Sequence, residues 1–138
     1  MKPADYPAEP AHLWEHFYRL TQIPRPSGAE AAVRDYVVAQ AERAGCSWQL
    51  DAAGNIAVEV PGSAGREQLP TVIIQNHLDM VTVKTGDKQH DFHTQPLQLV
   101  VEAGWLRADR TTLGADNGVG CAAALALMSD PALAKASI

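Results

Sequence analysis

Residues 71–81 read TVIIQNHLDMV, and residues 111–120 read TTLGADNGVG. In the first stretch, four β-branched residues lead directly to His77 and Asp79, as in a buried strand of a parallel sheet. In the second stretch, Asp116 lies between glycines at the start of a helix of small residues. Because open α/β folds keep their sites at the carboxyl ends of the strands, these stretches predict an α/β fold with a metal site at the sheet edge.

The length, net charge and hydrophobicity of the chain argue against several classes of partner. Its 138 residues are enough for a single domain with a core. The formal net charge is −5 and no basic cluster occurs, which argues against nucleic acid and anionic membranes as partners. The longest uncharged apolar run, residues 119–128, is about half as long as a membrane span. The start, MKPADYPAEP, lacks the apolar core of a signal peptide, so we expect a cytoplasmic protein with free thiols.

Hydrophobic periodicity and turn residues predict helices, hairpins and one central strand. The expected helices cover residues 10–21, residues 27–44 with Ser27 and Glu30 as a capping box, and the stretch after residue 116. The expected strands are residues 47–50, 55–60, 71–76, 97–101 and 105–108. Residues 1–10 contain three prolines and are expected to be flexible.

The candidate site combines His77, Asp79 and Asp116. Neutral imidazole is a good zinc ligand, and a carboxylate such as Asp79 often orients its other ring nitrogen. An isolated His-x-Asp is also a common surface pair. Asp116 can bridge two metal ions about 3.5–4 Å apart, or it can cap the helix that follows. Gly118 and Gly120 also suit a phosphate loop, but the remaining dinucleotide fingerprint is missing and the turn is acidic.

Other histidines fit weaker patterns. His12, Glu15 and His16 match the H-x-x-E-H pattern of a different metalloprotease class. We expect them instead on a solvated polar helix face. His90 and His93 flank an Asp-Phe pair in a polar segment, where loop contacts are expected rather than metal ligands.

The two motifs together resemble the M20 zinc peptidases. Within that family they are most similar to the bacterial aminoacyl-histidine dipeptidases, which cleave Xaa-His dipeptides. The Asp116-Asn117-Gly118 sequence favours this branch over the tripeptidases and the deacetylases. Further matching positions extend over nearly the whole chain: Leu13-Trp14, Ile23-Pro24, Pro26-Ser27, Gly54-Asn55, His90-Asp91-Phe92 and Thr111-Thr112-Leu113.

This resemblance implies the N-terminal part of a three-layer α/β/α catalytic domain with a mixed, largely parallel sheet. His77 would be a metal ligand, Asp116 the carboxylate that bridges two zinc ions, and Asp79 the catalytic residue that orients His77. Manganese or cobalt are alternatives to zinc. The resemblance also implies a cis peptide bond after Asp116, dipeptide substrates and a homodimer.

The sequence departs from the family after Asp116. The family carries a downstream Glu-Glu pair, a further acidic ligand and a late His, whereas no Glu or His follows Asp116 here. The lid and dimerisation domain is also absent from the 138 residues. We therefore expect residues 1–138 to form one segment of an M20-type catalytic domain that supplies part of the site and is inactive alone. The alternatives are another M20 amidohydrolase (a tripeptidase or a deacylase) and a non-catalytic remnant or binding half.

Overall fold

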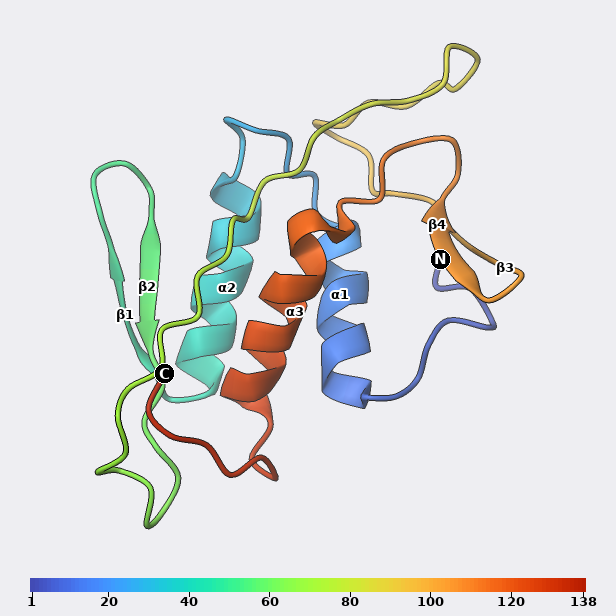
Figure 1. Cartoon of the computed structure of the whole chain (residues 1–138). Coiled ribbons are helices and arrows are strands. Elements are labelled where there is room, and N and C mark those ends of the chain that lie inside the picture. Colours follow the sequence, from blue (N-terminus) through green and yellow to red (C-terminus); the bar gives the residue numbers. More distant parts are fainter.

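A computed structural model describes all 138 residues. Its elements are α1 (Ala11–Thr21), α2 (Ala31–Arg43), β1 (Ser47–Leu50), β2 (Ile56–Glu59), β3 (Leu99–Glu102), β4 (Trp105–Ala108) and α3 (Ala115–Ser129). Helix α3 lies between α1 and α2, with the β1–β2 hairpin beside α2 (Figure 1). The predicted α/β class, three helices and two hairpins are confirmed. None of the helices is both long enough and apolar enough to cross a bilayer.

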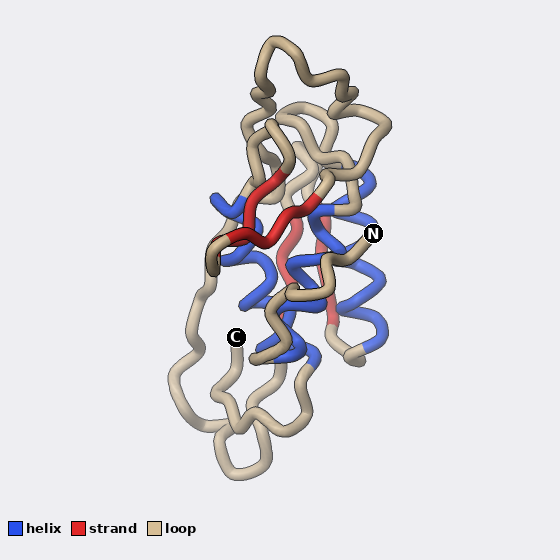
Figure 2. The backbone as a smooth tube through the Cα atoms, turned by 90° about the vertical axis from the view of Figure 1, so that its right-hand side faces the viewer, coloured by secondary structure: helices blue, strands red, loops and turns tan.

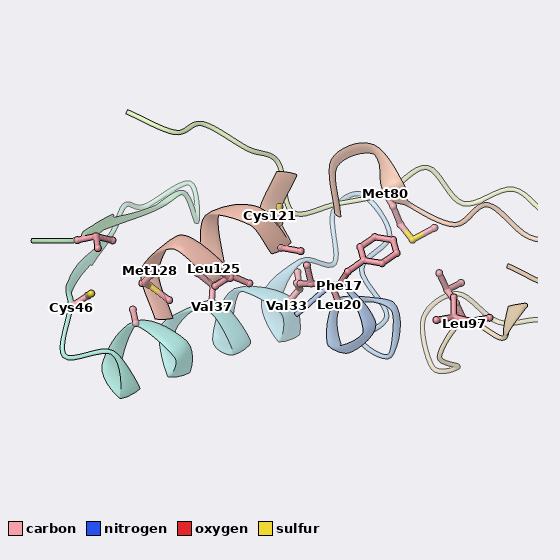
Figure 3. Close-up of a cluster of buried hydrophobic side chains, with 14 of the residues drawn as sticks. Phe17, Leu20, Val33, Val37, Cys46, Met80, Leu97, Cys121, Leu125 and Met128 are labelled. Atoms are coloured by element: carbon pink, nitrogen blue, oxygen red, sulfur yellow. The ribbon is translucent and has the colours of Figure 1, made fainter. Parts of the chain in front are cut away.

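The core lies where the three helices meet. Phe17 and Leu20 of α1, Val33 of α2 and Ala122 of α3 are each no more than 1% exposed. Figure 3 shows the buried side chains gathered along the helix contacts. Because α3 consists mainly of Ala, Leu and Gly, its backbone can approach its neighbours closely. Full burial of each large apolar side chain contributes about 1.5–3 kcal/mol.

Both hairpins are antiparallel and are closed by short turns. In the β1–β2 hairpin, Leu50 pairs with Ile56, and the Asp51 carboxylate accepts hydrogen bonds from the Ala53 and Asn55 amides. In the β3–β4 hairpin, the two turn residues Ala103 and Gly104 both have positive φ, at 48° and 80°. That geometry matches the right-handed twist of the strands.

The predicted central strand at residues 71–76 is wrong. The segment forms no sheet, and its one backbone hydrogen bond runs from the Val72 N–H to the Ser137 carbonyl, at 2.9 Å. Ile73 is 90% exposed. A strand is defined by its ladder, and apart from the last residues of the chain no segment lies beside this one to provide it. The β-branched residues favour an extended backbone, but a strand also needs a neighbouring segment with which to pair.

The predicted mixed, largely parallel sheet is accordingly not formed by these residues. The strands make two separate two-stranded sheets, seen as distinct red pairs in Figure 2. One isolated parallel bridge occurs, between Pro26 and Met80. The long loop from β2 to β3 carries the segment in which the strand was expected.

The predicted capping box before α2 is also wrong. The helix begins at Ala31 with Glu30 as its N-cap residue, and no side chain caps the free amides. The Glu30 carboxylate instead accepts a 2.6 Å hydrogen bond from the Gly28 amide. Ser27 points away from the helix and donates to Asp79. The reason is that Ser27 lies inside a turn, closed by a 2.9 Å hydrogen bond from the Ala29 N–H to the Pro26 carbonyl, and the helix begins only after this turn.

Residues 1–10, for which the sequence predicted flexibility, lie against α1. Tyr6 is 8% exposed and packs edge-on against Trp14, with 5.9 Å between ring centroids. Its hydroxyl donates to the Trp14 carbonyl at 3.0 Å, and Lys2 pairs with Glu15 at 2.7 Å. Burial is the main cause that raises the pKa of Tyr6. These contacts hold the segment on the helix surface.

Candidate metal centre

His77 lies between two carboxylates. Its Nδ1 atom is 3.0 Å from Oδ1 of Asp79, and its Nε2 atom is 3.0 Å from Oδ1 of Asp116. The structure therefore brings together all three residues that the sequence singled out, although 39 positions separate the second pair. The side chain of His77 is 52% exposed and that of Asp116 is 96% exposed, so a solute can reach both.

Hydrogen bonds stabilise the charged forms in this cluster. The hydrogen bond to Asp116 is the main cause that raises the pKa of His77, and the hydrogen bond to Asp79 adds to it. The hydroxyl of Ser27 is the main cause that lowers the pKa of Asp79, followed by His77. An imidazolium between two carboxylates can donate a hydrogen bond from each ring nitrogen, and this is why both neighbours favour the charged form of His77.

Ser27 is a site residue that sequence reasoning missed. It donates a hydrogen bond to Oδ2 of Asp79, while His77 occupies Oδ1 of the same carboxylate. Both oxygens of Asp79 are thus held, which fixes the plane of the carboxylate and the orientation of the His77 ring. The sequence offered two signals at Ser27, the capping pattern before α2 and the match of Pro26-Ser27 to the family, and neither indicated a contact with Asp79.

Arg25 was also missed, and it connects the two loops of the site. Its side chain is 2% exposed. Nη1 donates to the carbonyls of Leu78 and Asp79 at 2.8 and 3.1 Å, and Nη2 donates to the carbonyl of Gly114 at 2.7 Å. Burial lowers the pKa of Arg25, yet a guanidinium remains charged in proteins. In the sequence, Arg25 lay between two prolines that simply ended a helix.

The glycines before and after Asp116 make room for Arg25. A Cβ atom on Gly114 would lie 2.6 Å from Nη2 of Arg25, and one on Gly118 would lie 2.7 Å from the same atom. Gly114 also has a φ of 68°, which L side chains rarely adopt. Of the two glycines that suggested a phosphate loop, Gly118 is thus explained by the buried cation.

The start of α3 is irregular at Asp116. Gly114 is the N-cap residue, and both Asp116 and Asn117 have non-helical backbone angles. The Asp116–Asn117 peptide bond is cis, as the family resemblance implied. Because no side chain caps the helix, the alternative role of Asp116 as a helix cap is not what the structure shows. Its carboxylate points to His77 instead.

The donor set fits two positions of a metal site. An imidazole nitrogen and a carboxylate oxygen that face each other are ligands suited to zinc, manganese or cobalt. Asp79 lies on the far side of the ring from this point, in the place of an orienting partner. No group of three or more His, Cys, Asp or Glu side chains could hold a metal ion in this chain. A four-coordinate site would need further ligands.

The remaining histidines do not extend the site. His16 is 7% exposed, with Nδ1 2.8 Å from the Tyr36 hydroxyl and Nε2 3.0 Å from the Ser129 hydroxyl. The expectation of a solvated face was therefore wrong for His16, because α2 and α3 cover it. Both of its nitrogens are engaged, which leaves none for a metal. His90 packs edge-on against Phe92 in the loop, as expected of a loop contact.

The chain is similar to known peptidases both in sequence and in fold. No family model matches the chain. The cytosol non-specific dipeptidase of Escherichia coli (strain K12) is 42% identical over 121 residues, which cover 88% of this chain and 25% of that protein. The crystal structure of aminoacylhistidine dipeptidase from Vibrio alginolyticus has a TM-score of 0.91 at 38% identity, and the match covers 94% of this chain and 26% of that one.

These matches define the chain as a homologue of the N-terminal part of a peptidase. More particularly, the two relatives are both dipeptidases, so the resemblance inferred from the motifs is confirmed. The chain spans about a quarter of their length. A tripeptidase from Staphylococcus aureus shares the fold, with a TM-score of 0.71 at 20% identity.

Removal of the Asp116 charge should lower the pKa of His77. In the metal-free protein we expect His77 to titrate above about 6.5, its ordinary value. An Asp116→Asn variant should shift the midpoint down, because the main cause of the rise is lost. Because the pKa of His77 is higher in the folded than in the unfolded protein, the pair of His77 and Asp116 contributes its full stabilisation at pH values below the unfolded pKa. This stabilisation is lost as the pH rises through the folded pKa. NMR titration of the imidazole measures the shift.

The matched control is Asp130→Asn, since Asp130 lies 4.0 Å from His12 and makes no contact with His77. An unchanged His77 midpoint in Asp116→Asn would contradict the geometry described above.

Replacement of Arg25 by Lys should destabilise the whole chain. A single ammonium cannot reach carbonyls in both loops as the fork does, so buried carbonyls lose their donor. We expect the free energy of unfolding to fall by about 3 kcal/mol. Urea denaturation followed by circular dichroism measures the change. Arg66→Lys, on an exposed loop, is the control and should leave stability unchanged; equal midpoints for the two variants would refute the role of Arg25.

Proposed function

We propose that this chain forms one part of the active site of a metal-dependent dipeptidase of M20 type. The observation that carries the proposal is the position of His77, whose Nε2 faces Asp116 at 3.0 Å while Asp79 binds its other nitrogen. The identity of 42% to a dipeptidase supports the reaction class. The proposed substrates are unblocked dipeptides, with Xaa-His dipeptides among them, and the proposed location is the cytosol.

Each residue has a separate proposed role. His77 and Asp116 would hold the metal, with an imidazole nitrogen and carboxylate oxygens as the donors. Asp79 acts through His77 by fixing its ring, and Ser27 holds Asp79 in turn. When bound, zinc polarises a carbonyl and lowers the pKa of a coordinated water. Manganese or cobalt would accept the same donors.

The chain alone supplies too few groups for catalysis. Two ligands face each other here, and no Glu or His follows Asp116 to act as a base or as a further ligand. We therefore propose that the 138 residues bind metal weakly and hydrolyse nothing by themselves. The same observation favours a second candidate, a non-catalytic half that binds a partner. A zinc-dependent turnover by the isolated chain, abolished by His77→Ala, would contradict this proposal.

Loss of the orienting carboxylate should weaken metal binding. In an Asp79→Asn variant the neutral amide is a weaker acceptor for the Nδ1–H of His77 and holds the ring less firmly, so zinc affinity should fall by about 10–100-fold. Isothermal titration with zinc chloride measures the affinity at constant pH. His93→Ala is the control, because His93 is exposed in a loop outside the site. If Asp79→Asn and His93→Ala bind zinc equally well, zinc is held somewhere else.

A chimera tests the proposed reaction. The corresponding N-terminal segment of the Escherichia coli dipeptidase is replaced by this chain, which supplies the missing parts from a relative of 42% identity. We expect hydrolysis of dipeptides, and loss of that activity to background with His77→Ala. Parallel assays with tripeptides and N-acyl amino acids separate the dipeptidase from the two other M20 activities. A folded, metal-loaded chimera without peptidase activity would overturn the proposal.

A further inference from the structure

Two asparagines connect the segments that carry the candidate metal ligands. Asn76 directly precedes His77, and Asn117 directly follows Asp116. Nδ2 of Asn117 donates to Oδ1 of Asn76 at 3.1 Å, and His77 faces Asp116 at 3.0 Å. Two side-chain contacts therefore join the same two segments, whose paired residues lie 41 and 39 positions apart in the sequence.

The contact between the asparagines depends on the absence of a side chain at Gly120. A Cβ atom on Gly120 would lie 2.5 Å from Oδ1 of Asn76 and closer still to Oδ1 of Asn117. Gly120 lies within α3 and has a helical backbone, which any residue can adopt. The small size of glycine, rather than its conformational freedom, is therefore what this position requires.

Other contacts near the site hold backbone atoms on either side of Asp116. Arg25 donates to the carbonyl of Gly114 at 2.7 Å, two residues before Asp116. The thiol of Cys121 donates to the carbonyl of His77 at 3.2 Å. In Figure 3, Cys121 lies where the start of α3 meets the segment that leads to His77. Neither contact fixes the direction of the Asp116 side chain.

The turn that contains Asp116 is held by few side chains. Asp116 and Asn117 have non-helical backbone angles, and no side chain caps α3. The side-chain hydrogen bonds of these two residues run to His77 and to Asn76. The first joins two proposed metal donors, so it is lost when a metal binds between them. The second uses no metal donor and is compatible with the metal-bound state.

We propose that Asn76 is a positioning residue, which keeps Asp116 opposite His77 by holding the side chain of Asn117. The inference rests on the proposed metal site. Both asparagines are half-buried, which limits the competition of water for their hydrogen bond. Without the oxygen of Asn76, the turn that carries Asp116 can move, and the ordering of the two ligands must then be supplied at the moment when the metal binds.

Hydrogen exchange in the metal-free chain tests the hold on the turn. The Gly118 amide donates to the Gly114 carbonyl at 3.0 Å and closes this turn. In Asn76→Ala the Gly118 amide should exchange about tenfold faster, while the Leu125 amide in the middle of α3 keeps its rate. Asn76→Asp retains an oxygen acceptor and should keep the slow exchange. Gln75→Ala, whose exposed side chain makes no hydrogen bond, is the matched control.

Zinc titration of the same variants tests the consequence for the metal site. Asn76→Ala should bind zinc chloride about tenfold more weakly than the wild-type chain, and Gln75→Ala should bind normally. Gly120→Ala removes no hydrogen-bonding group but fills the space next to both amide oxygens. It should therefore weaken zinc binding and accelerate exchange at Gly118 in the same way as Asn76→Ala.

The inference is overturned if exchange at Gly118 is unchanged in Asn76→Ala, or if Gly118 and Leu125 accelerate together, because the role would then be one of general stability. It is also overturned if Asn76→Asp behaves as Asn76→Ala, or if Asn76→Ala and Gln75→Ala bind zinc equally well. Absence of zinc binding by the wild-type chain, or binding that His77→Ala leaves unchanged, contradicts the proposed function instead. The exchange rates then decide the inference by themselves.

Discussion

The buried guanidinium of Arg25 is the interaction on which the site depends. It satisfies the carbonyls of Leu78 and Asp79 on one loop and of Gly114 on another, at distances of 2.7 to 3.1 Å. No carboxylate accepts a hydrogen bond from it, so its charge is stabilised by carbonyl dipoles together with the nearby charge of Asp79. A buried charge is tolerated only when hydrogen bonds or opposite charges compensate the loss of water. His77 and Asp116 therefore meet because a third residue, from the loop after α1, fixes the backbone of both.

The same constraint decides which residues surround Asp116. Gly114 and Gly118 leave the space that Nη2 of Arg25 occupies. Gly120 has a different reason, since a Cβ there would lie 2.1 Å from the side-chain oxygen of Asn117. Asn117 in turn donates to Asn76 at 3.1 Å, directly before His77. These three positions are thus occupied by glycine because side chains from elsewhere in the fold approach them closely.

Local patterns were sufficient for the helices and hairpins. Hydrophobic periodicity and turn residues each act within a few residues, and both were visible in the sequence. The strand at residues 71–76 could not be decided in this way, because pairing depends on a segment far away in sequence. His16 was misplaced for the same reason, since its cover comes from Tyr36 and Ser129.

The residues of the site likewise fall into a group that short motifs predicted and a group that they did not. The trio of His77, Asp79 and Asp116 was predicted from short motifs, because the chemistry of each residue is visible in its neighbours. Ser27 and Arg25 act on residues more than 50 positions away, and nothing next to them indicates this. Positioning residues of this kind become visible only when the chain is folded.

The exposed segment at residues 71–76 has a practical consequence for work with this chain. It is an uncharged run with three successive β-branched apolar residues, and it has no proline within it. Such segments stack between molecules as cross-β ladders when their edges are free. The nearest residues that oppose such stacking are Pro70 on one side and Asp79 on the other. Aggregation at high concentration should therefore begin here, and a single lysine in place of Ile73 is the substitution that would suppress it with least disturbance to the core.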